Sequence, residues 1–251
     1  MAQQRVKGRR SAAVQSKVEA QPQAGVMAVG AHHDDNELVA GTLARLRDAG
    51  WRLLSVVMTD GVWIHGKVAP EHVAIRERES RAAARLLGME CAFLRFPEGN
   101  FHCTVEAQLA LVEQIRRFRP ALIMTHPPHD YHLDHIETSR CVYEAVHVCG
   151  NPTVRTAAEP CARPALYYAD AWFVPFEPDE YVDIGDQVAL KRRVLGSHKS
   201  QLPPPRSGQD SMIDLAVLQN RFRGVEAGVR YAEAFRLQPF AGAGRLRRIL
   251  P

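Results

Sequence analysis

The sequence of 251 residues predicts an α/β fold: an open, mostly parallel, Rossmann-like sheet with helices on both faces. Three observations lead to this fold class. Short apolar runs alternate with segments of helical apolar spacing through the first 150 residues. Glycine or proline ends several of these segments, as at Gly50, Gly88 and Pro97. Two dense polar clusters stand directly after apolar runs, where such sheets bind their ligands.

The elements of the predicted core, residues 26–150, follow one another in βαβ order. An apolar run that is closed by a turn signal, such as Asp60-Gly61, predicts a strand. Apolar residues at helical spacing predict the intervening helices, and Pro120 marks the end of one of them. We expect strands over residues 26–31, 53–58, 91–96 and 121–125, and helices over 38–48, 71–87, 105–118 and 134–148.

Beyond residue 150 the alternation is weaker, and residues 151–251 are predicted to form a small C-terminal extension of the same domain. The apolar pattern suggests short strands at 166–168 and 181–184. Helices are expected over 186–197 and 215–235, with a proline-rich loop over 201–210 between them. Residues 26–251 are therefore expected to make one domain.

Charge is unevenly distributed along the chain. Residues 1–25 carry five Lys or Arg and one Glu, which leaves 27 basic and 27 acidic residues of the totals of 32 and 28. We expect this segment to be a disordered basic leader, and the balanced remainder gives no charge argument for a nucleic-acid or membrane partner. No apolar run is long enough for a membrane span, and the N-terminus has no secretory signal. Five scattered cysteines suggest reduced thiols, and together these features predict a cytoplasmic protein.

The two polar clusters are residues 32–37, which contain two His, two Asp and a Glu, and residues 125–135, with the sequence THPPHDYHLDH. Because both follow predicted parallel strands, we expect them to meet at one edge of the sheet. Imidazole and carboxylate are ligands that zinc and similar ions prefer. The spacing favours a metal site over two alternatives, which are a metal-free carboxylate and histidine site and a purely structural cluster with helix N-caps.

Within the first cluster, His32 and Asp34 are two residues apart at a strand end, so their side chains should leave on the same side. One of the adjacent carboxylates can bind a metal while the other stays free as a base. In the second cluster Asp134 lies between His132 and His135 and can orient one of these imidazoles.

The segment AHHDDNE, residues 31–37, resembles the AHPDD-x-E motif of the LmbE/PIG-L family of zinc-dependent de-N-acetylases. The segment THPPHDYHLDH is similar to the second motif of that family, which ends in His-Pro-Asp-His. The resemblance covers about residues 26–236. His33 and Leu133 stand where the motifs have proline, and neither change removes a functional atom from the pattern.

The resemblance implies a zinc-dependent hydrolase that removes an N-acetyl group from an N-acetylglucosamine-like sugar or glycoconjugate. Another divalent transition metal would also suit these ligands. Asp34 would be the base that acts on zinc-bound water, and His132 would stabilise the oxyanion or protonate the leaving amine, helped by Asp134. The implied roles are metal ligands for His32, Asp35 and His135, and a substrate contact for Arg76.

Several residues outside the motifs carry separate expectations. Asp130 can contact substrate or support the site from behind, and strand alternation should point His33 away from His32. His198 can be structural or catalytic, and Trp172 and Phe173 can belong to a sugar-binding rim or to the core.

The implied partner is a small N-acetylated sugar, and relatives suggest a homo-oligomer. The alternative function is a non-catalytic sugar- or nucleotide-binding α/β protein. The absence of a GxGxxG sequence after the first strand argues against nucleotides.

Overall fold

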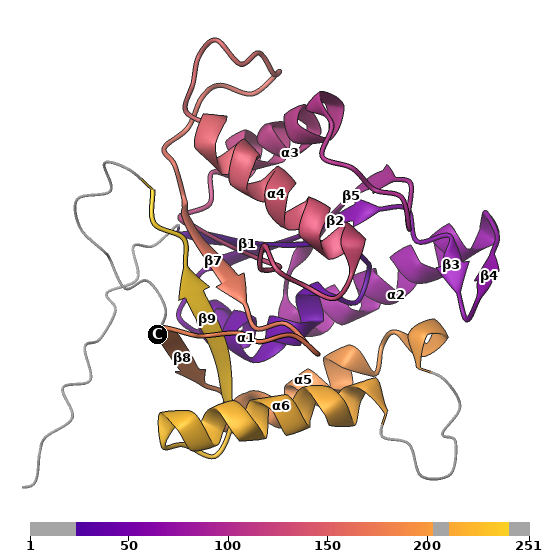
Figure 1. Ribbon diagram of the computed structural model, residues 1–251, viewed down its shortest axis with the longest axis vertical. Coiled ribbons are helices and arrows are strands. Elements are labelled where there is room, and N and C mark those ends of the chain that lie inside the picture. Colours follow the sequence, from indigo (N-terminus) through magenta and orange to yellow (C-terminus); the bar gives the residue numbers. More distant parts are fainter. Residues whose placement is uncertain (1–23, 203–210, 241–251) are drawn as a thin grey trace, which may run out of the picture.

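The computed structural model describes residues 24–202 and 211–240 and confirms the predicted fold class (Figure 1). Seven strands form one sheet in the order β5-β2-β1-β6-β7-β9-β8. Their bounds are β1 Gly25–Gly30, β2 Arg52–Thr59, β5 Glu90–Phe96, β6 Leu122–Thr125, β7 Ala165–Ala169, β8 Glu180–Asp183 and β9 Ala232–Leu237. A separate two-stranded hairpin, β3 Trp63–Ile64 with β4 Lys67–Val68, was not predicted from the sequence.

Six α-helices and three short 3-10 helices surround the sheet in the described part of the chain. The α-helices are α1 Ala40–Asp48, α2 Glu71–Leu87, α3 Val105–Phe118, α4 Leu133–Val148, α5 Val188–Leu195 and α6 Met212–Ala227. The 3-10 helices are η1 Asn36–Val39, η2 Gly185–Gln187 and η3 Lys199–Gln201. None of these helices is both long and apolar enough to cross a bilayer.

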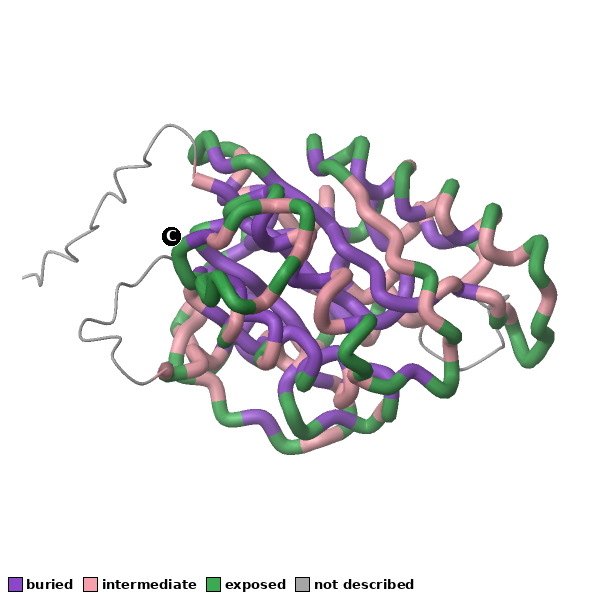
Figure 2. The backbone as a smooth tube through the Cα atoms, turned by 90° about the horizontal axis from the view of Figure 1, so that it is seen from above, coloured by how far each residue is buried: buried purple, intermediate pink, exposed green. Residues whose placement is uncertain are grey.

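Helices cover both faces of the sheet because its central strands are apolar on both sides. In β1, Val26 and Ala28 pack into a core with α1, α2 and α5, whereas Met27 and Val29 pack into a second core with α3 and α4. Figure 1 shows the two helix layers above and below the sheet, and Figure 2 shows the buried backbone running through the centre.

The strand order places both polar clusters at one edge. Strands β5, β2, β1, β6 and β7 are parallel, and the chain crosses from β5 on one side of β1 to β6 on its other side. The loops that leave the carboxyl ends of β1 and β6 therefore begin side by side, at the point where α/β sheets form a binding crevice.

The C-terminal region differs from the prediction in one element. The helix expected over 215–235 ends at Ala227, because Gly228 takes the left-handed conformation with φ 71°, and residues 232–237 form β9. Strand β9 is antiparallel to both β7 and β8. Most of the predicted leader and of the proline-rich loop lies outside the described residues, but Gly25 already belongs to β1.

Candidate metal centre and active site

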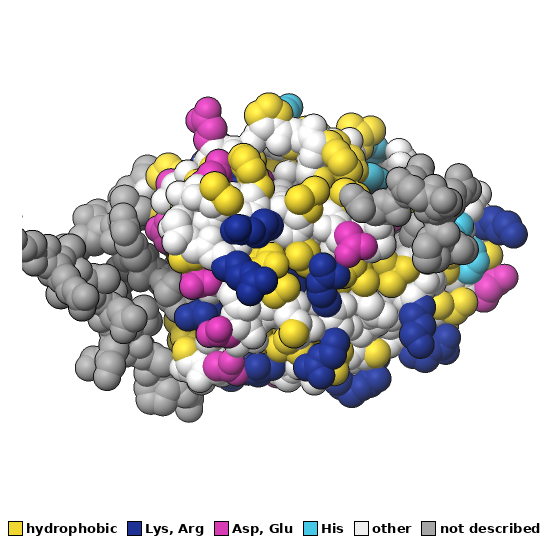
Figure 3. All heavy atoms as spheres, turned by 90° about the horizontal axis from the view of Figure 1, so that it is seen from below, with side chains coloured by type: hydrophobic (Ala, Val, Ile, Leu, Met, Phe, Trp, Pro, Cys, Tyr) yellow, Lys and Arg dark blue, Asp and Glu magenta, His cyan; other side chains and the backbone are white. Residues whose placement is uncertain are grey.

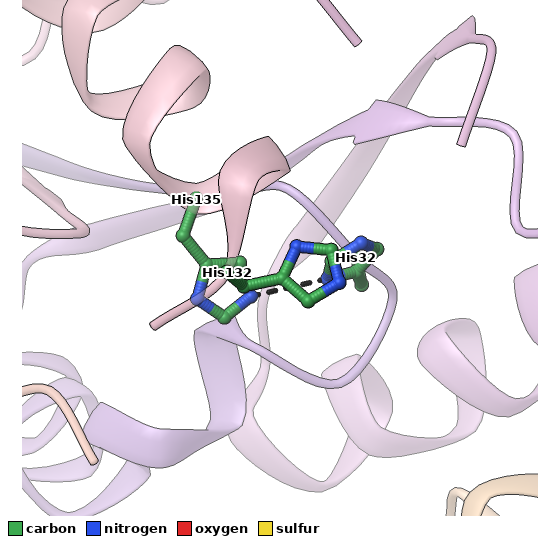
Figure 4. Close-up of side chains that lie close together, drawn as sticks. All are labelled: His32, His132 and His135. Atoms are coloured by element: carbon green, nitrogen blue, oxygen red, sulfur yellow. Dashed lines mark hydrogen bonds between the residues drawn. The ribbon is translucent and has the colours of Figure 1, made fainter. Parts of the chain in front are cut away.

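The side chains of His32, Asp35 and His135 converge at the carboxyl edge of the sheet. His32 and Asp35 lie in the loop after β1, and His135 lies in the first turn of α4. Nδ1 of His32 is 3.2 Å from Nε2 of His135 and 3.4 Å from Oδ2 of Asp35. Oδ1 of Asp35 is 3.5 Å from Nε2 of His135. Figure 4 shows the two imidazoles facing each other, with His132 beside them.

Asp35 precedes the helix η1, but its carboxylate does not cap that helix. Its Oδ2 instead accepts a hydrogen bond of 2.6 Å from the backbone N–H of His32. The capping role that an aspartate at this position often has is therefore not the reason for its placement.

Two buried carboxylates fix which ring nitrogen of each histidine faces the centre. Oδ2 of Asp134 lies 3.2 Å from Nε2 of His32, and Oδ1 of Asp130 lies 3.0 Å from Nδ1 of His135. A carboxylate accepts hydrogen bonds only, so these ring nitrogens carry the protons. The opposite nitrogens, Nδ1 of His32 and Nε2 of His135, are left as lone-pair donors, as in metal sites with a carboxylate behind each imidazole.

The resulting donor set fits a zinc ion in both chemistry and spacing. Four tetrahedral ligands at zinc distances of 2.0 to 2.2 Å stand about 3.3 Å from one another. Nδ1 of His32 and Nε2 of His135 are 3.2 Å apart, and they lie 3.4 Å and 3.5 Å from Oδ2 and Oδ1 of Asp35, respectively. Two lone pairs and a carboxylate facing one another repel unless a proton or a cation lies between them, which makes this set a candidate metal centre.

The electrostatics of the centre also favour a bound cation. Burial opposes charging of His32, but the neighbouring Asp35 and the hydrogen bond to Asp134 outweigh it and raise the pKa of His32 to about 10. The same balance of burial against Asp35 and Asp130 raises the pKa of His135 to about 9. Burial alone would raise the pKa of Asp35, yet His135, His126 and His32 hold it well below its usual range.

Two further groups of three side chains have ligand atoms within 4.8 Å of one another, namely His32 with His132 and His135, and Asp35 with His126 and His135. Nε2 of His126 lies 3.1 Å from the backbone nitrogen of Ala31 and 3.1 Å from Oδ2 of Asp35, so this ring nitrogen is already engaged by groups of the chain. Nδ1 of His132 likewise accepts the N–H of Asp134 at 3.2 Å. The set with free lone pairs is therefore His32, Asp35 and His135.

His132 stands beside the metal centre as a neutral hydrogen-bond donor. Burial and then the nearby His32 and His135 lower its pKa. Since its Nδ1 accepts the N–H of Asp134, the proton of the neutral ring is on Nε2. The carboxylate of Asp134 supports His32, so the imidazole that it orients is that of His32.

Asp34 and Arg76 line the same cavity as the candidate ligands. Nη2 of Arg76 donates to Oδ1 of Asp34 at 3.0 Å, and Nη1 donates to Oε1 of Glu98 at 2.7 Å and to the carbonyl oxygen of Trp63 at 3.3 Å. The Arg76 side chain is 2% exposed, and these hydrogen bonds position Asp34 and Glu98. Asp130 is also buried and supports His135, which places it behind the centre, and it does not line the cavity.

The cavity has a volume of about 160 Å³ with a polar floor and an aromatic rim. Sequence reasoning missed Glu98, although it follows the carboxyl end of β5 and so has the same positional signal as the two clusters. The other lining residues that were not predicted as part of the site come from distant loops and helices, and they are Leu38, Tyr131, Gln201 and Met212.

Two histidines that were considered in the sequence lie away from the cavity. His33 is 1% exposed and stacks on Phe93 with ring centroids 5.4 Å apart, and burial with the nearby Arg76 lowers its pKa to about 3. It points away from His32, as strand alternation predicts. His198 is fully buried, with Nε2 3.5 Å from Oε1 of Glu37.

A family model and a curated relative match this chain. Residues 27–146 match the family model described as PIG-L, GlcNAc-PI de-N-acetylase. Over 225 residues the chain is 28% identical to the diacetylchitobiose deacetylase of Thermococcus kodakarensis, an alignment that covers 85% of this chain and 83% of that protein.

Solved structures share the whole described architecture. The N,N'-diacetylchitobiose deacetylase of Pyrococcus horikoshii superimposes with a TM-score of 0.76 at 25% identity, covering 86% of this chain and 84% of that one. GalB, the 4-carboxy-2-hydroxymuconate hydratase of Pseudomonas putida KT2440, superimposes with a TM-score of 0.72 at 19% identity over 89% and 100% of the two chains, which shows the fold alone. The motifs, the architecture and the family match agree that residues 27–146 carry the PIG-L/LmbE family domain.

Proposed function

We propose that this protein is a zinc-dependent de-N-acetylase that acts on N-acetylglucosamine-like sugars. One observation carries the proposal: Nδ1 of His32 and Nε2 of His135 stand 3.2 Å apart, and each lies 3.4 or 3.5 Å from one carboxylate oxygen of Asp35, beside Asp34 in one cavity. The names of the relatives from Thermococcus and Pyrococcus support the reaction and the sugar class. Another divalent transition metal would suit the same ligands.

When bound, zinc would supply Lewis acidity, which lowers the pKa of water and polarises a carbonyl group. The chain's own residues then act as follows. Asp34, held at Oδ1 by Arg76, removes a proton from the attacking water as its oxygen adds to the amide carbon. The Nε2–H of His132 donates a hydrogen bond to the oxygen that becomes negative. Asp34 then delivers its proton to the amine nitrogen as the C–N bond breaks.

The proposal separates the base from the ligands, and two variants test that separation. Asp34→Asn should keep bound zinc and lose activity by roughly 10²–10⁴, because only the proton transfer is removed. His135→Ala should lower the bound zinc per chain as well as the activity. Acetate release from N-acetylglucosamine and N,N'-diacetylchitobiose, with and without chelator, gives the activity, and elemental analysis gives the metal.

Asp183→Asn is the matched control, since Asp183 is exposed and does not line the cavity. It should leave both zinc content and acetate release unchanged. An Asp34→Asn variant with wild-type turnover would remove the assigned base. Zinc-loaded protein that binds these sugars but releases no acetate would instead favour the non-catalytic alternative.

A further inference from the structure

Three aromatic side chains stand together at the mouth of the cavity and are called here the aromatic rim. Tyr131 and Trp172 line the cavity, and Phe173, which does not line it, contacts both of their rings. The Phe173 ring is 5.3 Å from the Tyr131 ring at 81° and 6.1 Å from the Trp172 ring at 73°. Tyr131 is 49% exposed and Phe173 is 76% exposed, so the rim presents apolar ring surface to solvent beside the site.

The backbone of the rim is strained at Phe173. Phe173 has φ 60°, a left-handed conformation that favours glycine and costs free energy for a bulky residue. Such strain persists only where the surroundings hold the segment in place, and it is concentrated at functional sites.

Helix α6 supplies the contacts that hold this segment. Nε1 of Trp172 donates to Oε1 of Gln219 at 2.6 Å. Arg223 pairs with both oxygens of Asp170, and its Nη2 donates to the carbonyl oxygen of Phe176 at 3.1 Å. The segment is therefore anchored on both sides of Phe173.

The size of the cavity indicates what the rim would contact. A volume of about 160 Å³ is below the roughly 300–1,000 Å³ of most ligand sites. The cavity can take the reacting amide and part of its sugar, so the rest of a larger ligand must lie over the mouth. Of the described residues that line the cavity, the only cationic side chain of the Lys or Arg type is Arg76, which Asp34 and Glu98 already engage.

We propose that the aromatic rim is a specificity-determining subsite for a second pyranose ring, so that the protein prefers disaccharides or longer oligosaccharides to single sugars. This inference rests on the proposed deacetylase function. A pyranose presents an apolar C–H face that packs on aromatic rings and leaves its hydroxyl groups in water. Among the described residues the rim has no free Lys or Arg, which does not favour a phosphate-linked group in this position.

Removal of the Phe173 ring is the direct test. Phe173→Gly deletes the ring and also suits the positive φ, so the zinc-loaded full chain should keep its thermal stability. With N,N'-diacetylchitobiose its kcat/KM should fall about tenfold, mainly through KM, because one aromatic contact is lost. With N-acetylglucosamine its kcat/KM should stay unchanged. The Phe173→Trp variant, which keeps an aromatic ring, should keep the wild-type kcat/KM with the disaccharide.

Phe222→Ala is the matched control. Phe222 is 57% exposed on the outer face of α6 and does not line the cavity. Figure 3 shows the face of the molecule that α6 helps to form, where hydrophobic side chains are interspersed with Lys and Arg. This variant should leave kcat/KM with both sugars unchanged. Equal losses on both sugars in Phe173→Gly, or no loss on the disaccharide, would overturn the subsite.

Calorimetric titration with chitobiose and with glucosamine separates the subsite from the reaction, because these sugars have no acetyl group to remove. Wild-type protein should bind chitobiose more tightly than glucosamine, and Phe173→Gly should lose that preference. If wild-type protein releases no acetate yet shows this Phe173-dependent preference, the deacetylase proposal fails and the subsite stands. If acetate is released but Phe173→Gly keeps the preference, the subsite fails and the deacetylase stands.

Discussion

Residues 32–35 contribute to the candidate metal centre, and residues 38–42 contribute to a second buried polar cluster. The two clusters are built in opposite ways. In the second cluster, called here the closed cluster, Lys191 of α5 donates to Glu233 of β9 at 2.7 Å and to the carbonyl oxygen of Leu38. The two carboxylate oxygens of Glu233 accept the N–H groups of Gly41 at 3.0 Å and Thr42 at 2.7 Å, at the start of α1. Opposite charges and matched donors make it complete within the chain.

The metal centre has no such internal balance. The facing ring nitrogens of His32 and His135 and the carboxylate of Asp35 are all acceptors when both rings are neutral, and the site opens onto a cavity. Buried polar clusters of these two kinds differ in how their groups are paired. A cluster in which opposite charges pair stabilises the fold, whereas one whose acceptors face one another takes up a proton or a cation.

The greatest change in unfolding free energy is expected for a substitution in the closed cluster. Lys191→Met leaves the Glu233 charge buried without its cation and should lower the free energy of unfolding by about 3–5 kcal/mol. The adjacent Arg192 pairs with Asp214 at 3.0 Å, but both side chains are nearly half exposed. Arg192→Met should therefore cost no more than about 1 kcal/mol.

Urea unfolding of chelator-treated protein measures both values without a contribution from bound metal. Similar losses in the Lys191→Met and Arg192→Met variants would show that the closed cluster does not stabilise the fold more than a surface pair does. The assignment of a stabilising role to the closed cluster would then be wrong.

The sequence predicts most of this arrangement because its strongest signals are local. Apolar runs locate the central strands, and their alternation with helices places both polar clusters at one edge of the sheet. The candidate ligands His32, Asp35 and His135 are recognised from their motifs, and the structure brings the three together. Which carboxylate supports which imidazole is a contact between distant loops, and spacing along the chain does not encode it.

The prediction of a helix over 215–235 fails for a related reason. The residues of β9, AEAFRL, are mostly good helix formers, so their local preference points away from a strand. Pairing with β7 and β8 and the burial of Glu233 override that preference. Gly228, in its left-handed conformation, is the one local sign of the break.

A smaller effect is expected where support of the metal centre is weakened but its ligands are kept. Asp134→Asn removes the charge behind Nε2 of His32 and should weaken zinc binding by about 10- to 100-fold. Competition with a chromophoric chelator measures this affinity. The carboxylate also accepts N–H groups of Gly99 and Phe101, so a control must perturb the same loop.

Glu137→Gln is that control. Oε2 of Glu137 accepts the N–H of Cys103 at 2.8 Å, in the same loop, and Glu137 does not line the cavity. This variant should keep wild-type zinc affinity. Equal weakening in Asp134→Asn and Glu137→Gln would assign the effect to the loop and not to the orientation of His32.

The smallest effect concerns a third buried group, His198, whose charge depends on pH. Burial opposes its protonation, but Glu37 and then Asp34 and Glu79 outweigh burial and raise its pKa above the ordinary value of 6.5. A group with a raised folded-state pKa contributes its full stabilisation below pH 6.5 and loses it as the pH rises through the raised value. The difference in unfolding free energy between wild type and His198→Asn should therefore be larger at pH 6 than at pH 9.

Urea unfolding at several pH values checks this trend, with His102→Asn as the control because His102 is an exposed histidine. The control difference should be small and flat with pH. A His198→Asn difference that is equally flat would mean that the ring is neutral throughout. His198 would then belong with the neutral packing histidine His33, and Glu37 would be a second buried acceptor in this region without a cation.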